Sequence, residues 1–350
     1  MILEKKSIVL GIVAGRNPYV ERFLQNLDKS GLYSKIVVIC EGLKPVAVRN
    51  MVTVKQDIEK SYYSALREHK VNVLIHFGDI GCSHWKANGT QIESISNKLV
   101  NALIDSCDNS DIEHLIYISS SCVYSPVKSL WRTLGEEDLG NLNFENECEE
   151  RLSEKKIEEY ISENSQIGMT VLRPATILGP SSNVKYLVES NYWQRMSVIN
   201  SYPIQFTHEY DFIDLLNVVL DTGATGTFNV ASKGVVLPKE FSNIVERKIW
   251  SFPKALPFIA VNLIVRILTF HKLNYYEWSL FRHPIVLATS KVTDYFGFTP
   301  KFTSAEAAID YLYSNDVRDM EVFISAGDMP ADTHMEKGLG KWFSRIIRKR

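Results

Sequence analysis

The sequence predicts an α/β protein built around a doubly wound, parallel β-sheet. Runs that are apolar at successive positions, such as Lys35–Cys40 and Asn72–Phe77, alternate with amphipathic segments of helical period, such as Ile92–Cys107. Continuous apolar runs are typical of strands buried on both faces, as in a parallel sheet covered by helices. Strands that alternate with helices at this rhythm indicate right-handed βαβ units.

The segment Leu115–Tyr124 (LIYISSSCVY) is the centre of this pattern. Its apolar first half ends in Ser119, Ser120 and Ser121. Small hydroxyl residues at the carboxyl end of a buried parallel strand lie where open α/β sheets bind their ligands. A strand that merely ends in a polar turn has the same pattern, so the neighbouring elements must decide between the two interpretations.

The other expected elements follow in order along the chain. Ser7–Gly11 is expected to be the first strand, and a helix with Tyr19, Phe23, Leu24 and Leu27 on one face follows it. Beyond about Gly179 the rhythm becomes less regular. Further expected elements are helices at Ile58–Lys70, Glu149–Glu163, Asp211–Leu220, Pro238–Trp250 and Ser304–Tyr313, and strands at Met169–Pro174 and Gly226–Ala231.

The composition is that of an ordinary globular protein. Of 350 residues, 45% are hydrophobic and 23% are charged, and the formal net charge is −2, which gives no reason to expect nucleic acid as a partner. The five cysteines lack CxxC or Cys/His metal spacing, so we interpret them as reduced thiols of a cytoplasmic protein without a metal site. The apolar run after the first lysines is too short for a signal peptide.

Two segments of the C-terminal half have alternative interpretations. We divide the chain into 1–180, 181–315 and a polar, basic-ended tail at 316–350. The apolar segment 255–270 is too short to span a bilayer, and we interpret it as a buried helix, with a membrane-surface helix as the alternative. The end of the tail, Leu339–Arg350, mixes aromatic and basic residues, which suits either contact with an anionic membrane or a partner, or a frayed terminus.

The turn after the first strand is a candidate phosphate site. Pyrophosphate approaches backbone N–H groups at a helix N-terminus, for which glycines are needed. The sequence has Gly11 and Gly15 in a GxxxG spacing without a third glycine, which is a weak motif. Arg16 could contact a phosphate directly, and Pro18 suits the first turn of a helix.

Acidic and small residues after the next strands suggest the rest of a dinucleotide site. Glu41 follows the second strand, where a carboxylate accepts hydrogen bonds from a ribose 2′-hydroxyl and disfavours a 2′-phosphate, so NAD is favoured over NADP; a solvated loop acid is the alternative. Asp57 suits a helix N-cap or, with Ile58, an adenine contact. The predicted cofactor contacts are Gly11, Gly15, Arg16, Glu41, Asp57, Ile58, Phe77, Gly78, Ser119 and Pro174.

In their order, these residues resemble the extended short-chain dehydrogenase/reductase family, of the NAD-dependent epimerase/dehydratase type. The resemblance runs from about Ser7 to Tyr313. It implies a Rossmann domain with bound NAD(P) and a smaller, mixed C-terminal part that closes over a substrate, often a nucleotide sugar. It rests on the IVLG turn, VKQDI (Val54–Ile58), VLIHFGD (Val73–Asp79), IYISSSCVYS (Ile116–Ser125), VLRPATILGP (Val171–Pro180), QFTHEYD (Gln205–Asp211), GTFNVA and FGFTPKFTSAEAAIDYL.

The resemblance implies catalytic roles for Ser120 and Tyr124, but the family's YxxxK pair is not in its expected place. In the family, a Ser or Thr four residues before the Tyr of a VYG-like motif holds the substrate oxygen. When Glu154 is matched to the glutamate of the next helix, the two YxxxK places hold Asn146 and Glu150, or Glu147 and Arg151 after a slip of one residue. No tyrosine occurs between Tyr124 and Tyr160. The YxxxK at Tyr124–Lys128 contains Pro126 and is not expected to form a helical pair.

Several histidines have other interpretations. His76 lies inside an apolar strand and is interpreted as a core histidine with its hydrogen bonds satisfied. His84 lies in a loop from which it could reach a substrate, and His208-Glu209-Tyr210-Asp211 is a family landmark near the substrate cleft. A hydrolase built on Asp79, Ser120 and His84 is not supported, because the GxSxG nucleophile elbow is absent.

Three hypotheses follow. The first is a protein that binds NAD and a nucleotide sugar or similar small molecule, with redox chemistry that is weak, altered or absent. The second is an active NAD-dependent epimerase or oxidoreductase whose acid/base is Tyr124, Glu147 or His84. The third is a regulatory or scaffold protein without enzymatic activity. A homodimer and a membrane-surface contact through 255–270 or 339–350 are further expectations.

Overall fold

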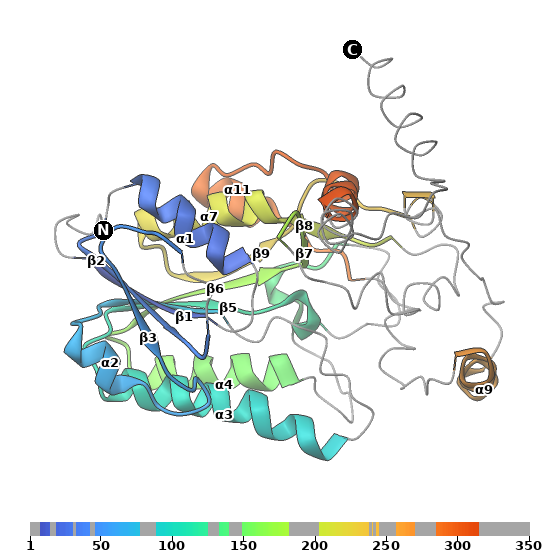
Figure 1. Cartoon of the computed structure of the whole chain (residues 1–350). Coiled ribbons are helices and arrows are strands. Elements are labelled where there is room, and N and C mark those ends of the chain that lie inside the picture. Colours follow the sequence, from blue (N-terminus) through green and yellow to red (C-terminus); the bar gives the residue numbers. More distant parts are fainter. Residues whose placement is uncertain are drawn as a thin grey trace, which may run out of the picture.

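A seven-stranded sheet forms the centre of the molecule, and all its neighbouring strands run parallel (Figure 1). The computed structural model of the chain describes residues 8–14, 19–30, 33–42, 46–77, 89–124, 133–139, 149–181, 203–237, 240, 243–244, 257–269 and 285–314. The strand order is β3-β2-β1-β4-β5-β6-β9, so the predicted doubly wound parallel sheet is confirmed. The strands are β1 (Val9–Ala14), β2 (Lys35–Cys40), β3 (Met51–Lys55), β4 (Val73–Phe77), β5 (His114–Ile118), β6 (Gly168–Pro174) and β9 (Gly226–Val230).

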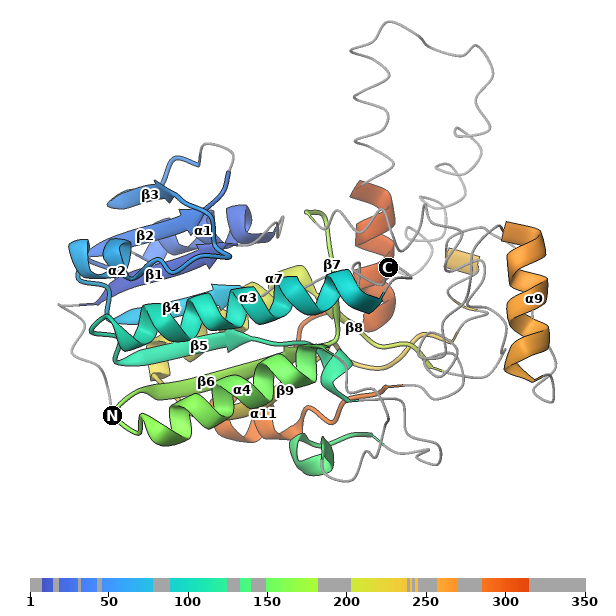
Figure 2. The same ribbon diagram turned by 90° about the horizontal axis from the view of Figure 1, so that it is seen from below.

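Helices cover both faces of the sheet, as Figures 1 and 2 show. Each covered face has its own apolar core: Phe23, Phe77 and Phe212 belong to one, and Leu66 and Leu103 belong to the other. Burial on both faces explains why the strands are apolar at successive positions. One layer contains α1 (Tyr19–Ser30), α7 (Glu209–Thr222) and α11 (Ser290–Phe296), and the other contains α2 (Tyr63–Glu68), α3 (Gly89–Asp108) and α4 (Glu149–Glu163).

The strand order reverses between β1 and β4. The chain builds β2 and β3 on one side of β1, and β4, β5, β6 and β9 on the other. The register aligns Ala14 with Phe77 and Phe77 with Ile118, so the carboxyl ends of β1, β4 and β5 meet at one edge. In open α/β sheets this edge, next to the reversal, is where ligands bind.

The first strand extends further than the sequence predicted. Gly11 lies in the middle of β1, since Ile12, Val13 and Ala14 continue the strand. A Cβ atom at Gly11 would lie 2.6 Å from Cγ1 of Val71 and 2.9 Å from Cδ1 of Leu74. Glycine at this position is therefore explained by close packing beneath the sheet, and the predicted turn at Gly11 is wrong.

The region around Asp57 also differs from the prediction of one helix at Ile58–Lys70. Asp57 Oδ1 accepts a hydrogen bond from Glu59 N (2.9 Å) and fixes a turn, and α2 begins only at Tyr63. The chain between them is held by Ser106 of α3, whose Oγ accepts from Tyr62 N at 2.8 Å. The preceding strand β3 was not predicted, because its alternating pattern of burial gives no continuous apolar run.

Most other predicted elements are confirmed to within a few residues. β2 and α4 have the predicted bounds, and the helix expected at Ser304–Tyr313 is present at residues 304–314. A short parallel pair, β7 (Thr176–Leu178) and β8 (Phe206–His208), shares a small core with this last helix. Most of the helix predicted at Pro238–Trp250 lies outside the described residues.

The apolar segment predicted at 255–270 forms α9 (Phe258–Thr269). Val261 is buried, but Ile259 is 79% exposed and Leu263 is 59% exposed, so the interpretation as a buried helix is wrong for this face. Among the helices of the described part of the chain, none has both the length and the apolar character needed to cross a membrane.

Candidate functional site

Several of the predicted site residues lie at the carboxyl edge of the sheet. Glu41 follows β2, Ser119 and Ser120 follow β5, and Pro174 ends β6. The paired registers place the ends of β5 and β6 side by side, and β1 and β4 lie between them and β2. The structure therefore brings residues from distant parts of the chain to the edge at which a ligand is expected.

Ser120 lies at the start of a tight turn that follows β5. Its side-chain oxygen accepts a hydrogen bond from Cys122 N (3.1 Å) and caps the 3₁₀ turn Ser121–Val123. Ser120 is only partly buried, whereas the neighbouring Ser119 is buried. The hydroxyl hydrogen of Ser120 is still available, because the oxygen acts as an acceptor in this cap.

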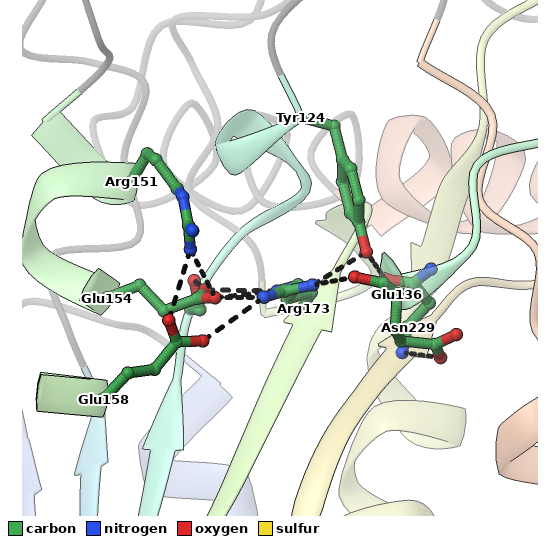
Figure 3. A network of polar contacts seen from close by, with 8 residues as sticks. Tyr124, Glu136, Arg151, Glu154, Glu158, Arg173 and Asn229 are labelled. Atoms are coloured by element: carbon green, nitrogen blue, oxygen red, sulfur yellow. Dashed lines mark hydrogen bonds and ion pairs between the residues drawn. The ribbon is translucent and has the colours of Figure 1, made fainter. Parts of the chain in front are cut away.

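A buried polar network around Glu154 and Arg173 lies beside the site (Figure 3), and it includes Ser119. The Ser119 hydroxyl donates to Glu154 Oε2 at 2.5 Å. Glu154 projects from α4 and receives Arg173 of β6 through Nε at 3.0 Å and through Nη2. The Glu154 side chain is fully buried and the Arg173 side chain is 2% exposed. Arg151 lies 3.6 Å from Glu154 and 3.4 Å from Glu158, which closes the network toward solvent.

Tyr124 lies on the other side of Arg173 in the same network. The Tyr124 hydroxyl donates to Asn229 Oδ1 (2.6 Å) and accepts from Arg173 Nη1 (3.0 Å). Asn229 N in turn donates to Glu136 Oε1 (2.8 Å), and Asn229 Nδ2 donates to the carbonyl of Leu134 (3.0 Å). Burial raises the pKa of Tyr124, although Arg173 and Asn229 oppose that shift.

One face of α4 carries three acidic side chains. Glu150, Glu154 and Glu158 recur at a spacing of four residues, so they share one face of the helix. Tyr117 on β5 lies near this face. Burial raises the pKa of the Tyr117 hydroxyl most, and the negative charges of Glu154 and Glu150 raise it further. Asn146 and Glu147 lie outside the described residues.

On the β2 side of the edge, the predicted cofactor contacts differ in exposure. Glu41 is exposed, whereas Ile58 is largely buried and Phe77 is fully buried. The Phe77 ring packs against Tyr19 and Phe23 of α1, with ring centroids 5.9 and 5.8 Å apart. Any approach of a ligand at Phe77 is therefore to its backbone.

Asp57 is occupied by local contacts. Besides capping its turn, it pairs with Lys60 at 3.2 Å. The hydrogen bond from Glu59 N, and then the one from Lys60, lower the pKa of Asp57. Of the two roles predicted for Asp57, the cap is present as a turn cap, and the adenine contact stays a prediction. Gly15, Arg16, Gly78, Asp79 and His84 lie outside the described residues.

Sequence reasoning missed a second buried carboxylate close to this edge. Glu209, the first residue of α7, is fully buried; its Oε2 accepts from Ser181 N (2.8 Å), and its Oε1 lies 3.0 Å from Arg22 Nε of α1. Tyr210 also contacts Arg22 through its hydroxyl and ring. The only local signal was the landmark QFTHEYD, which names Glu209 without its partner.

The rest of that landmark joins β8 and α7 to residues 301–310 near the end of the described chain. His208 Nε2 lies 3.2 Å from Asp310 Oδ2, and its ring stacks on Phe302. Asp211 accepts hydrogen bonds from the backbone N–H groups of Lys301 (2.9 Å) and Phe302 (3.1 Å). These residues hold elements together.

His76 differs from its prediction. Within the part of the chain that the structure describes, neither of its ring nitrogens has a hydrogen-bond partner, and it stacks on Tyr117 with ring centroids 5.9 Å apart. Burial lowers the pKa of His76 to about 4. No cluster of three or more metal-ligating side chains is present in the described ranges.

The fold described above is that of a Rossmann-like α/β protein, and sequence comparison gives the family. The chain belongs to the NAD dependent epimerase/dehydratase family, whose sequence model matches residues 20–230. The predicted family resemblance is confirmed.

Individual proteins of known structure have low sequence identity to this chain. The chain is similar to the UDP-glucuronic acid 4-epimerase of Bacillus cereus, solved with UDP-glucuronic acid and NAD, at 16% identity and a TM-score of 0.65, over 89% of this chain and 100% of that one. It is also similar to the UDP-glucose 4-epimerase of Thermotoga maritima, solved with UDP-glucose, at 13% identity and a TM-score of 0.63, over 89% and 99%. At these identities the similarity establishes the fold.

Curated relatives match only a part of the chain. Uncharacterized proteins of Mycobacterium bovis and Mycobacterium tuberculosis are 25% identical over 152 residues. This stretch covers 41% of the present chain and 39% of theirs.

Proposed function

We propose that the protein binds NAD(H) and a nucleotide sugar, or a similar small molecule, at the carboxyl edge of its parallel sheet. The observation that carries this proposal is the reversal of strand order beside β1, in a chain of the NAD dependent epimerase/dehydratase family. The solved neighbours that contain NAD and UDP-sugars support the same ligand classes.

The residues at the edge fit such a cofactor. The exposed carboxylate of Glu41 at the end of β2 can accept hydrogen bonds from a ribose diol and would repel a 2′-phosphate, which favours NAD over NADP. Ser120 offers a hydroxyl donor at the end of β5. When bound, the nicotinamide would supply the redox chemistry, and these side chains would bind and orient the ligands.

We further propose that acid/base chemistry at this site is weak or altered. A general base works best with a pKa near the operating pH. The Tyr124 hydroxyl is instead buried, with a raised pKa, and it already donates to Asn229. Glu150, at one of the places counted for the family's lysine, cannot lower the pKa of a neighbouring acid as an ammonium does. Tyr124 then acts as a positioning residue for the loop after β5.

Cofactor binding can be measured directly. NADH is titrated into the full chain, with energy transfer from tryptophan as the signal. Glu41→Ala is expected to weaken binding by about tenfold or more, since hydrogen bonds to a charged group are lost. Glu113→Ala is the matched control, because Glu113 is an exposed acid just before β5, at the opposite edge of the sheet. Absence of NADH binding at millimolar concentration would favour the scaffold hypothesis instead.

Turnover separates the two enzymatic hypotheses. UDP-glucose and UDP-glucuronic acid are incubated with the protein and NAD, and the sugar products are analysed. If the protein turns over one of them, Ser120→Ala is expected to abolish turnover and to leave NADH affinity nearly unchanged. Rapid turnover that Tyr124→Phe abolishes would contradict the proposal of altered chemistry.

A homodimer stays a prediction, which light scattering can test.

A further inference from the structure

The exposed side of α9 carries two large apolar side chains and one basic side chain. Ile259 and Leu263 are one turn apart, and Arg266 lies on the same side of the helix, where it is exposed. With 79% and 59% of their surface exposed, Ile259 and Leu263 are among the most exposed large apolar side chains of the described residues. We call these three residues the α9 face.

This apolar face lies in a part of the sequence without negative charge. From Arg247 to Tyr276 the chain contains five basic residues and no acidic one. The same stretch includes Trp250, Phe252 and Phe258 among its aromatic residues. Basic residues attract anionic lipid, aromatic residues prefer the membrane–water interface, and a short apolar helix in such a stretch suits a position in that interface.

The place of α9 in the molecule is compatible with such a contact. Figures 1 and 2 both show α9 away from the sheet, beyond the carboxyl ends of the strands. α9 is too short to cross a bilayer, so the contact would lie in the plane of the surface.

From these observations we propose that the α9 face docks the protein on an anionic membrane surface. Ile259 and Leu263 insert among the acyl chains near the headgroups, and Arg266 stays at headgroup level, where its charge faces anionic lipid. The proposal is independent of catalysis. It selects the segment 255–270, and not the tail at 339–350, as the site of membrane contact.

The test is flotation of the full chain with vesicles of phosphatidylcholine that contain about one third phosphatidylglycerol. Binding is expected to these vesicles, to decrease as salt rises, and to be far weaker with phosphatidylcholine alone. The double variant Ile259→Gln/Leu263→Gln is expected to reduce the bound fraction on the order of tenfold or more. The matched control is Leu152→Gln, since Leu152 is 43% exposed on α4.

Further variants separate the alternatives. Removal of residues 339–350 is expected to leave binding in place, and Arg266→Gln is expected to make it weaker and less dependent on salt. The proposal is wrong if the wild-type protein does not float with the anionic vesicles, or if the double variant floats as well as the wild type. It is also wrong if the double variant dissociates a stable dimer, because the α9 face would then be covered by a second copy of the chain.

Discussion

Replacing Glu154 with glutamine would remove the negative charge that Arg173 needs in the interior. The Arg173 side chain is 2% exposed and its principal partner Glu154 is fully buried. Loss of one partner from a buried ion pair costs about 3–5 kcal/mol, since it leaves an uncompensated charge. Glu158 Oε1 lies 3.7 Å from Arg173 Nη2 and would supply part of the missing charge. We therefore expect Glu154→Gln to lower the free energy of unfolding by about 3 kcal/mol, the lower end of that range.

The assay is urea unfolding followed by far-UV circular dichroism. Domains of this kind are stable by about 5–15 kcal/mol, so the variant should fold and show a displaced midpoint. The matched control is Glu159→Gln on the same helix, where the side chain is 64% exposed; a change within about 0.5 kcal/mol is expected. The double variant Glu154→Gln/Arg173→Met should lose less free energy of unfolding than the two single variants lose together, by more than about 1 kcal/mol. A loss below about 1 kcal/mol in Glu154→Gln itself would refute the reasoning.

Three other changes test particular contacts. Burial lowers the pKa of His76 to about 4 from 6.5, so the unfolded chain binds more protons than the folded chain between these pH values. The contribution of neutral, buried His76 to the free energy of unfolding is complete above about pH 6.5, and about 3 kcal/mol of it is lost as the pH falls toward 4. His76→Phe should flatten this part of the pH dependence in urea midpoints, and an unchanged slope would assign it to other groups. Gly11→Ala should destabilise the protein by about 1–3 kcal/mol because the new Cβ has no room. Gly42→Ala should not, since nothing lies within 4 Å of its Cβ. Equal melting temperatures of the two variants would contradict this prediction. Tyr124→Phe should cost about 1–3 kcal/mol in thermal unfolding, since two polar partners are left unsatisfied, and a weakened NADH affinity would show that Tyr124 touches the cofactor.

Local sequence patterns were sufficient for the elements with a regular period. β2 is a continuous apolar run and α4 is a charged amphipathic helix, and both have the predicted bounds. The pattern failed where a residue had a special reason to be present. The glycine spacing predicts a turn at Gly11, but Gly11 is a strand glycine that makes room for Val71 and Leu74.

The candidate site was predictable only in part, for a related reason. The position of Ser119 and Ser120 at the sheet edge follows from the order of strands, and that order is a regular feature of βαβ folds. The composition of the polar network that Ser119 joins through Glu154 does not follow from it. Arg173 and Asn229 come from strands that are distant in sequence, and nothing in their own surroundings signals a shared network.

Asn229 has a consequence for the order in which the molecule can be completed. The contacts of Arg173 to Glu154, Tyr124 and the carbonyl of Glu136 all involve residues that precede it in the chain. Tyr124 and Glu136, which supply two of these contacts, are themselves held by Asn229 of β9, the last strand of the sheet in sequence. A nascent chain that stops before β9 would contain Arg173 without the hydrogen bonds that Asn229 makes to Tyr124 and Glu136. Pairing of β9 with β6 therefore completes the hydrogen bonds of this buried network.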